Sequence, residues 1–445
     1  MLNARLSRFI IAALIVMLPL VYFFPAVTLE NLLAMGDSLQ YSILLRKLLG
    51  EQLRAGVLPL WNPYTFGGMP LLAAIQPGVL YPPNWLFAVL PLGVAQNFVV
   101  ITSYHWGLLG TYLFVRALGL SRISSLFSGL TFAFGGYLIA HLEQLNYLAA
   151  AVWCPWLLLA LERARQAANL SDAVRWGSWG AVFVALQCFA GLPQATWQGG
   201  LICAAYSLFA LVTDRPARKR FALAALTMVI GGALLSAIQL LPARELQLHG
   251  ERLAIPYSEF ASFSMPPRRL LTLIAPYFFG GAHPGLFKLG GYDYWWLHKY
   301  QYAYLGLSSL LLIPLAWLLP KHRQPVCFWS LLALLALVLS LGDALPWMNE
   351  TLYRVPIYNL FRAPYRQLFG LAFAAAVLAG FGLEALRTVE RARLKQWLQI
   401  SSISLITLVA LTATLYRWGG AWLQTAQPAP ARSFAQAEIL MPLLG

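Results

Sequence analysis

Long apolar runs, separated by short basic segments or long aromatic-rich ones, dominate this 445-residue chain. A helix that crosses a bilayer needs about 20 predominantly apolar residues, and runs near this length recur about eleven times. The predicted spans cover residues 9–27, 95–115, 123–140, 147–161, 176–191, 195–213, 221–241, 301–319, 326–341, 366–386 and 396–416. The pattern predicts an all-α polytopic membrane protein.

The composition agrees with this prediction. Hydrophobic residues make up 60% of the chain and charged residues 11%, whereas soluble domains carry about 25% charged residues. The formal net charge of +15 alone would fit a nucleic-acid binder. The chain has no basic tail or basic repeat, however, and its Lys and Arg residues lie between apolar runs, as in cytoplasmic loops of membrane proteins. We therefore expect no nucleic-acid partner.

The basic residues also predict an orientation. If the N-terminus is cytoplasmic, every short basic loop falls on the inner side, as the positive-inside rule requires. Those loops hold Arg116 and Arg122; Arg163, Arg165 and Arg175; Arg215, Arg218, Lys219 and Arg220; Lys321 and Arg323; and Arg387, Arg391, Arg393 and Lys395. The first run ends in Phe23-Phe24-Pro25, a poor cleavage context, so it is predicted to be an uncleaved span rather than a signal peptide. We expect a multi-pass protein of the cytoplasmic membrane.

Three long segments, about 28–94, 242–300 and 342–365, fall on the outer side and are rich in Pro, Gly, Trp and Tyr. Such segments are typical of short helices and turns packed on a membrane surface. Segment 38–55 is predicted to be an interfacial helix with an apolar face and a polar stripe. The apolar face comprises Leu39, Ile43, Leu44, Leu48, Leu49 and Leu53, and the stripe comprises Arg46, Lys47, Glu51 and Arg54.

Several motifs resemble the YfhO-like family of bacterial membrane proteins. They are Gly36-Asp37, Leu58-Pro59-Leu60-Trp61-Asn62-Pro63-Tyr64, Phe66-Gly67-Gly68-Met69-Pro70, Tyr81-Pro82-Pro83-Asn84, Gly191-Leu192-Pro193-Gln194, Leu273-Ile274-Ala275-Pro276-Tyr277-Phe278-Phe279-Gly280 and Phe361-Arg362-Ala363-Pro364-Tyr365-Arg366. The resemblance extends from about residue 30 to residue 390, and the block at 58–70 is its most specific part.

This resemblance implies a single GT-C-like transmembrane domain over residues 1–445, acting as a glycosyltransferase on the outer face with a polyprenyl-phosphate sugar as donor. It also implies that Asp37, in the first outer segment, is the catalytic base. Members of the family are usually longer, so we expect an outer C-terminal part after about residue 417 to be truncated here. The family often has His where this chain has Leu192.

The chemistry needs few parts. An acceptor hydroxyl needs a base as it attacks the anomeric carbon, and a carboxylate such as Asp37 provides one. The alternative for Asp37 is a helix N-cap for segment 38–55.

The departing phosphate needs cations, and arginine has the geometry to bind it. Arg362 and Arg366 are the first candidates, with lipid-headgroup anchoring as the alternative.

Three further arginines are secondary candidates for the donor phosphate. Arg268 and Arg269 follow Met265-Pro266-Pro267 and otherwise form an exposed loop pair. Arg244 otherwise makes a local ion pair with Glu245. No nucleotide-binding loop or dinucleotide fingerprint occurs in the sequence.

The candidates for binding the sugar or the acceptor are aromatic and polar residues of the outer segments. They are Trp61, Asn62, Tyr64, Glu143, Tyr292, Asp293, Trp295 and Trp296. Aromatic faces stack on sugar rings, but Trp and Tyr also form the interfacial belts of membrane proteins. The sequence favours a turn-holding role for Asn62, and Glu143 is either a second acid or a solvated loop residue.

We expect no cofactor. A divalent ion needs several oxygen ligands, and Leu39 occupies the place of a second acid in a DxD motif, so a metal is not expected to be obligatory. The four cysteines and six histidines form no metal-ligand motif.

Two other functions compete with the transferase. A transporter or flippase for lipid-linked sugars should carry charges and helix breaks at mid-span, and few are found. A non-catalytic scaffold for envelope assembly should tolerate loss of Asp37. The acceptor remains open between an envelope glycopolymer, a lipid and a protein.

Overall fold

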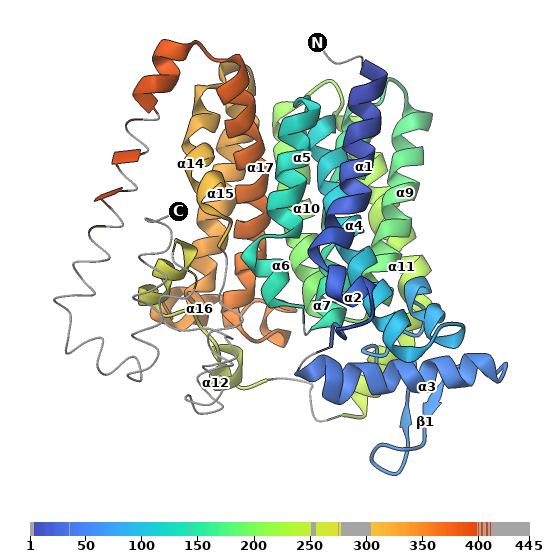
Figure 1. The fold of residues 1–445 in the computed structure, drawn as a ribbon. Coiled ribbons are helices and arrows are strands. Elements are labelled where there is room, and N and C mark those ends of the chain that lie inside the picture. Colours follow the sequence, from blue (N-terminus) through green and yellow to red (C-terminus); the bar gives the residue numbers. More distant parts are fainter. Residues whose placement is uncertain are drawn as a thin grey trace. The chain divides into compact units, whose positions relative to one another are not determined.

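The computed structural model describes residues 4–34, 36–142, 144–250, 255–274, 276 and 304–397, together with 399, 402, 403, 406, 407 and 410. These residues are mostly helical (Figure 1). Contacts within the chain divide it into two compact units, each treated separately below. The first comprises Met1–Gly129 and His141–Ala254, and the second comprises Leu130–Ala140 and Ile255–Gly445.

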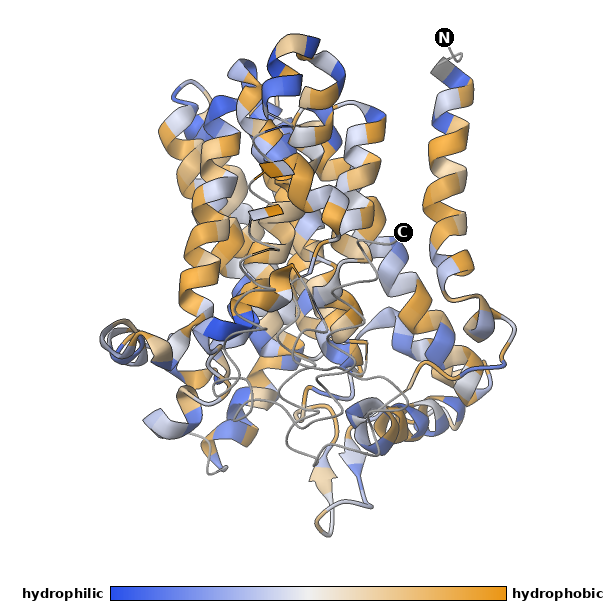
Figure 2. Cartoon of the chain, turned by 60° about the vertical axis from the view of Figure 1, so that its left-hand side comes forward, coloured by the Kyte–Doolittle hydropathy of each residue, from blue (hydrophilic) through white to orange (hydrophobic). Residues whose placement is uncertain are grey.

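Eight helical segments of the described residues are long and apolar enough to cross a membrane. They are Arg5–Tyr22, Leu92–Ala117, Arg122–Ala140, Leu145–Gln166, Pro193–Thr213, Arg218–Leu248, Pro320–Ser340 and Pro364–Thr388. Apolar residues line these helices, and hydrophilic residues gather towards their ends (Figure 2). The prediction of a multi-pass, all-α membrane protein is therefore confirmed.

Eight of the eleven predicted spans match these segments. The span predicted at 176–191 corresponds to α9 (Leu170–Phe189), a 20-residue helix outside the set of eight. The run at 301–319 contains only a short helix, α14 (Leu307–Leu312), followed by a 3₁₀ turn at Ile313–Leu318. The run at 396–416 lies mostly outside the described residues.

The first unit is a helical bundle with a surface helix across one end. Its longer helices are α1 (Ala4–Tyr22), α3 (Ile43–Arg54), α4 (Leu92–Ala117), α8 (Cys154–Gln166), α9, α10 (Pro193–Thr213) and α11 (Arg218–Leu248). The short helices α2 (Phe24–Val27) and α7 (Leu145–Ala151) lie between them in the chain, and α5 (Arg122–Ala133) begins in this unit.

The short basic loops of the first unit share one end of the bundle with the N-terminal helix. Arg122 Nη1 donates to Ser7 Oγ at 3.3 Å, which joins the α4–α5 loop to the beginning of α1. Gln166 Nε2 donates to the carbonyl of Ala117 at 2.7 Å, and Arg220 Nη1 donates to the carbonyl of Ala168 at 2.6 Å. This clustering is what the positive-inside rule predicts for one membrane face.

The opposite end of the first unit carries α3, which lies across the ends of the spans (Figure 1). The helical character predicted for segment 38–55 is correct: a π-helical turn at Ser38–Ser42 leads into α3. A two-stranded antiparallel hairpin, β1 (Trp61–Asn62) and β2 (Met69–Pro70), follows it and extends away from the spans.

The second unit packs around α17 (Leu368–Thr388). The ring of Phe373 on α17 lies edge-on to Phe132 at 5.0 Å and to Trp329 of α15 (Arg323–Ser340) at 5.6 Å. The short helices α6 (Gly136–Ala140), α12 (Tyr257–Phe260) and α16 (Pro346–Tyr353) complete this unit, with 3₁₀ turns at Pro267–Leu273, Pro320–His322, Gly342–Ala344, Tyr358–Leu360 and Pro364–Gln367.

Close packing of small residues joins α9 to α11. A Cβ added at Gly177 would lie 2.4 Å from the carbonyl oxygen of Ala224. Small residues that let backbones approach are typical of helix contacts in membranes. This contact embeds α9 in the bundle although the helix lies outside the eight segments that are long and apolar enough to cross a membrane.

Gly177→Ala is therefore expected to destabilise the protein by about 1–3 kcal/mol, because the added methyl group forces the two backbones apart. Gly200→Ala on α10 is the matched control, since no atom lies within 4 Å of its Cβ position. Detergent-titrated unfolding of both variants measures the difference. Equal stability of the two would contradict the close contact.

Candidate functional site

Asp37 immediately precedes the π-helical turn that leads into α3. Its backbone is helical, with φ −59° and ψ −31°, and its side chain makes no capping hydrogen bond to the turn. The N-cap alternative for Asp37 is therefore wrong, because its carboxylate does not satisfy the free amides of the helix. The side chain is half-buried, and among the described residues no ion pair to it is found.

The chain leading to Asp37 is held by two buried polar residues of α4. Asn97 Nδ2 donates to the carbonyls of Ala26 and Asn31 at 2.8 Å, and its Oδ1 accepts from the Leu33 amide at 2.8 Å. Gln96 Nε2 donates to the carbonyl of Leu33 at 2.9 Å. These contacts fix the approach to the acid, and the sequence motifs did not single out either residue.

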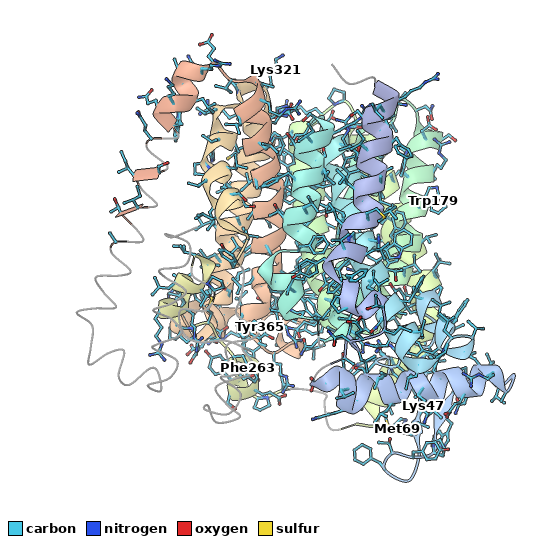
Figure 3. All side chains as sticks on the ribbon, in the orientation of Figure 1. Lys47, Met69, Trp179, Phe263, Lys321 and Tyr365 are labelled. Carbon is cyan, nitrogen blue, oxygen red and sulfur yellow. The ribbon has the colours of Figure 1, made fainter. Side chains whose placement is uncertain are left out.

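The polar stripe predicted for α3 is wrong at one position. Lys47 and Glu51 lie exposed as a pair 3.8 Å apart, and Figure 3 labels Lys47 on this helix. Arg46, however, is only 1% exposed. Two residues of the predicted apolar face, Leu39 and Leu44, are instead about half exposed.

The hairpin after α3 carries three of the candidate sugar-binding residues. Asn62 Oδ1 accepts from the Tyr64 amide and its Nδ2 donates to Thr65 Oγ1, both at 2.9 Å, so Asn62 holds the turn as the sequence favoured. Trp61 is half exposed, Tyr64 is 82% exposed, and Phe66 is 95% exposed with φ at +53°. The turn thus presents aromatic rings to solvent.

In the second unit, Arg362 and Arg366 flank a strained backbone position. Ala363 has φ +67°, a conformation that L-residues rarely adopt and that concentrates at functional sites. Arg362 is half exposed and forms an ion pair with Glu259 at 3.4 Å. Arg366 Nε donates to Tyr365 Oη at 3.3 Å, and the ring of Tyr365 packs edge-on against Phe263 (Figure 3).

The hydroxyls near this motif belong to tyrosines whose pKa values are raised. Burial raises the pKa of Tyr358 to about 12, and its hydroxyl accepts from Gln367 Nε2 at 3.0 Å. Burial, followed by the hydrogen bond to Asp343 at 2.7 Å, raises the pKa of Tyr257. Both remain protonated donors at neutral pH.

The secondary arginines have different environments. Arg269 is 6% exposed, so the expectation of an exposed loop pair is wrong for it, whereas Arg268 is exposed. Both lie in the 3₁₀ turn Pro267–Leu273 of the second unit. In the first unit, Arg244 is exposed and donates to Gln247 Oε1 at 2.8 Å instead of pairing with Glu245.

The remaining candidates, Glu143, Tyr292, Asp293, Trp295 and Trp296, lie outside the described residues. Among the candidates that are described, Asp37 and the hairpin belong to the first unit, and the four arginines 268, 269, 362 and 366 belong to the second. Within the part of the chain that the structure describes, no three His, Cys, Asp or Glu side chains form a group that could hold a metal. The prediction about metals remains a prediction.

Comparison with protein-family models and with curated proteins gives no match. The fold and the site residues define the class of the molecule as a helical, multi-pass membrane protein with an acid placed just after its first span.

Proposed function

We propose that this protein is a GT-C type glycosyltransferase that uses a polyprenyl-phosphate sugar to glycosylate a cell-envelope acceptor on the outer face of the cytoplasmic membrane. The observation that carries the proposal is the half-buried carboxylate of Asp37, which caps no helix and follows the first span. A half-buried acid that makes no ion pair among the described residues is available to act on a substrate, which supports the proposal.

The reaction follows from these parts. The acceptor oxygen attacks the anomeric carbon and forms the new glycosidic bond, while the bond from that carbon to the phosphate oxygen breaks. Asp37 takes the proton of the acceptor hydroxyl, and polyprenyl phosphate leaves with the electron pair. The leaving phosphate needs a cation, and the candidates that the sequence offers for this role are Arg362 and Arg366, with Arg268, Arg269 and Arg244 as second candidates.

If Arg362 binds the donor phosphate, that phosphate replaces the carboxylate of Glu259 as its anionic partner. Its ion pair with Glu259 joins two partly exposed side chains, and such pairs contribute about 0–1 kcal/mol. Loss of this ion pair by itself therefore costs little. Trp61 and Tyr64 are proposed to stack on the sugar or the acceptor.

A flippase for lipid-linked sugars is the second candidate, and the distribution of buried charge disfavours it. Among the described residues of the first unit, the buried Arg and Glu side chains, Arg46 and Glu162, lie near opposite ends of the bundle rather than at mid-span. A non-catalytic scaffold is the third candidate.

Turnover of the purified protein with a panel of polyprenyl-phosphate sugars tests the proposal. Comparable product from wild type and Asp37→Asn would reject Asp37 as the base.

A further inference from the structure

Arg46 is a buried cation with one nitrogen that lacks a partner. Its Nε donates to Asn84 Oδ1 at 3.3 Å, and its Nη2 donates to Asn146 Oδ1. Its Nη1 is buried and has no hydrogen-bond partner among the described residues. A guanidinium nitrogen can only donate, so the missing partner is an acceptor.

The described neighbours of Arg46 do not neutralise its charge. Both partners are neutral amides, and the described residues contain no ion pair between Arg46 and an acid. Burial lowers the pKa of Arg46 to about 10, so the side chain stays charged at neutral pH. Buried charges in proteins are normally paired, and an anion from outside the chain would complete this site.

The two amides cannot turn away from Arg46 without losing other contacts. Asn84 Nδ2 donates to the carbonyls of Pro77 and Gly78 at 3.3 and 3.0 Å, and Asn146 Nδ2 donates to the carbonyl of Gln76 at 2.7 Å. The turn that supplies these carbonyls begins at Ile75, which has φ +60°. The guanidinium is therefore held in one orientation.

The Gly-Leu-Pro-Gln motif supports the same turn. Gly191 has φ +93°, and a Cβ there would lie 2.7 Å from the carbonyl oxygen of Ile75. Only glycine fits this conformation and this close approach without strain. The motif thus packs directly against the turn that holds the partners of Arg46.

We propose that Arg46 is the cation of an anion site at the α3 end of the first unit, and that this site takes a phosphoryl group. The guanidinium fork matches phosphate oxygens, and α3 lies across the ends of the spans of the first unit. The headgroup region of a bilayer crossed by these spans is expected at such an end. Arg46 follows Asp37 by about 13 Å of helix. We place this site apart from the bond that Asp37 is proposed to act on.

The phosphate can come from a prenyl-phosphate lipid or from free phosphate, and binding to the full-length protein in detergent separates these sources. Thermal unfolding is followed while a polyprenyl phosphate, the uncharged polyprenol or inorganic phosphate is added. We expect stabilisation of the wild type by the polyprenyl phosphate and not by the polyprenol. Stabilisation by inorganic phosphate as well would assign the recognition to the phosphoryl group alone.

Arg46→Gln is expected to bind the stabilising ligand at least about 10-fold more weakly, because a charge-assisted hydrogen bond is lost. Lys47→Gln is the matched control, since Lys47 is the exposed neighbour on the same helix, and it should bind like the wild type. If Arg46→Gln does not fold, Arg46→Lys keeps the charge but loses the fork, and it should bind several-fold more weakly.

The proposal is overturned if neither phosphate ligand stabilises the wild type, or if the Arg46 variants respond as the wild type does. These readouts are independent of turnover. An inactive Asp37→Asn protein that still binds phosphate would leave this site intact, and an active protein without phosphate-dependent stabilisation would overturn this site alone.

Discussion

Asp37→Asn is expected to lower turnover by about 10²–10⁴-fold, the usual contribution of a positioned base. Asparagine has nearly the same shape but cannot accept a proton from the acceptor hydroxyl at neutral pH. Because the Asp37 carboxylate caps no helix, its removal should leave the fold intact. The measurement is the initial rate of sugar transfer by purified wild type and variant at saturating donor.

Glu30→Gln provides the matched control for Asp37→Asn. Glu30 is an exposed acid seven positions earlier in the same outer segment, and its replacement should leave the rate within about two-fold of wild type, since isolated surface changes have small effects. A rate of Asp37→Asn equal to that of Glu30→Gln would exclude Asp37 as the base, whereas unfolding of Asp37→Asn would reveal a structural role.

Glu162→Leu is expected to destabilise the protein by about 1–3 kcal/mol, because buried donors lose their acceptor, while Arg165 keeps its ion pair with Asp214 at 3.0 Å. The Glu162 side chain is 1% exposed and binds Arg165 through two hydrogen bonds of 2.7 Å. It also accepts from Tyr206 Oη and Gln166 Nε2, both at 2.6 Å. Leucine would remove the acceptor of these four hydrogen bonds at the basic end of the first unit.

Arg163→Gln is the control for Glu162→Leu, because Arg163 is the exposed neighbour on α8. Its effect should stay within about 0.5 kcal/mol. Detergent-titrated unfolding, followed by circular dichroism, gives both free energies. A loss below about 1 kcal/mol for Glu162→Leu would show that Arg165 and Tyr206 find other partners.

The spans were predictable because a bilayer requires long apolar helices, and this requirement is local in sequence. The predictions differ from the structure where local composition does not decide the outcome. The apolar run at 301–319 contains Pro314, and the chain there forms α14 and a 3₁₀ turn rather than one long helix. A proline removes a backbone donor and interrupts the helix.

The environment of the site was less predictable, because distant residues create it. The period of α3 placed Arg46 on a polar stripe, yet its partners Asn84 and Asn146 come 38 and 100 residues later and bury it. Asn97 likewise fixes the approach to Asp37 by accepting from the Leu33 amide, 64 positions earlier in the chain. The choice of Asp37 rests on its place after the first span, a feature of the sequence, and its role stays a prediction.

The most direct test of the transferase is the fate of a polyprenyl-phosphate sugar labelled separately in the sugar and in the lipid, added to wild-type protein in vesicles together with an envelope acceptor. We expect the sugar label to move to the acceptor while the lipid label is released as polyprenyl phosphate. Passage of the intact doubly labelled donor across the bilayer, with no bond broken, would contradict this expectation.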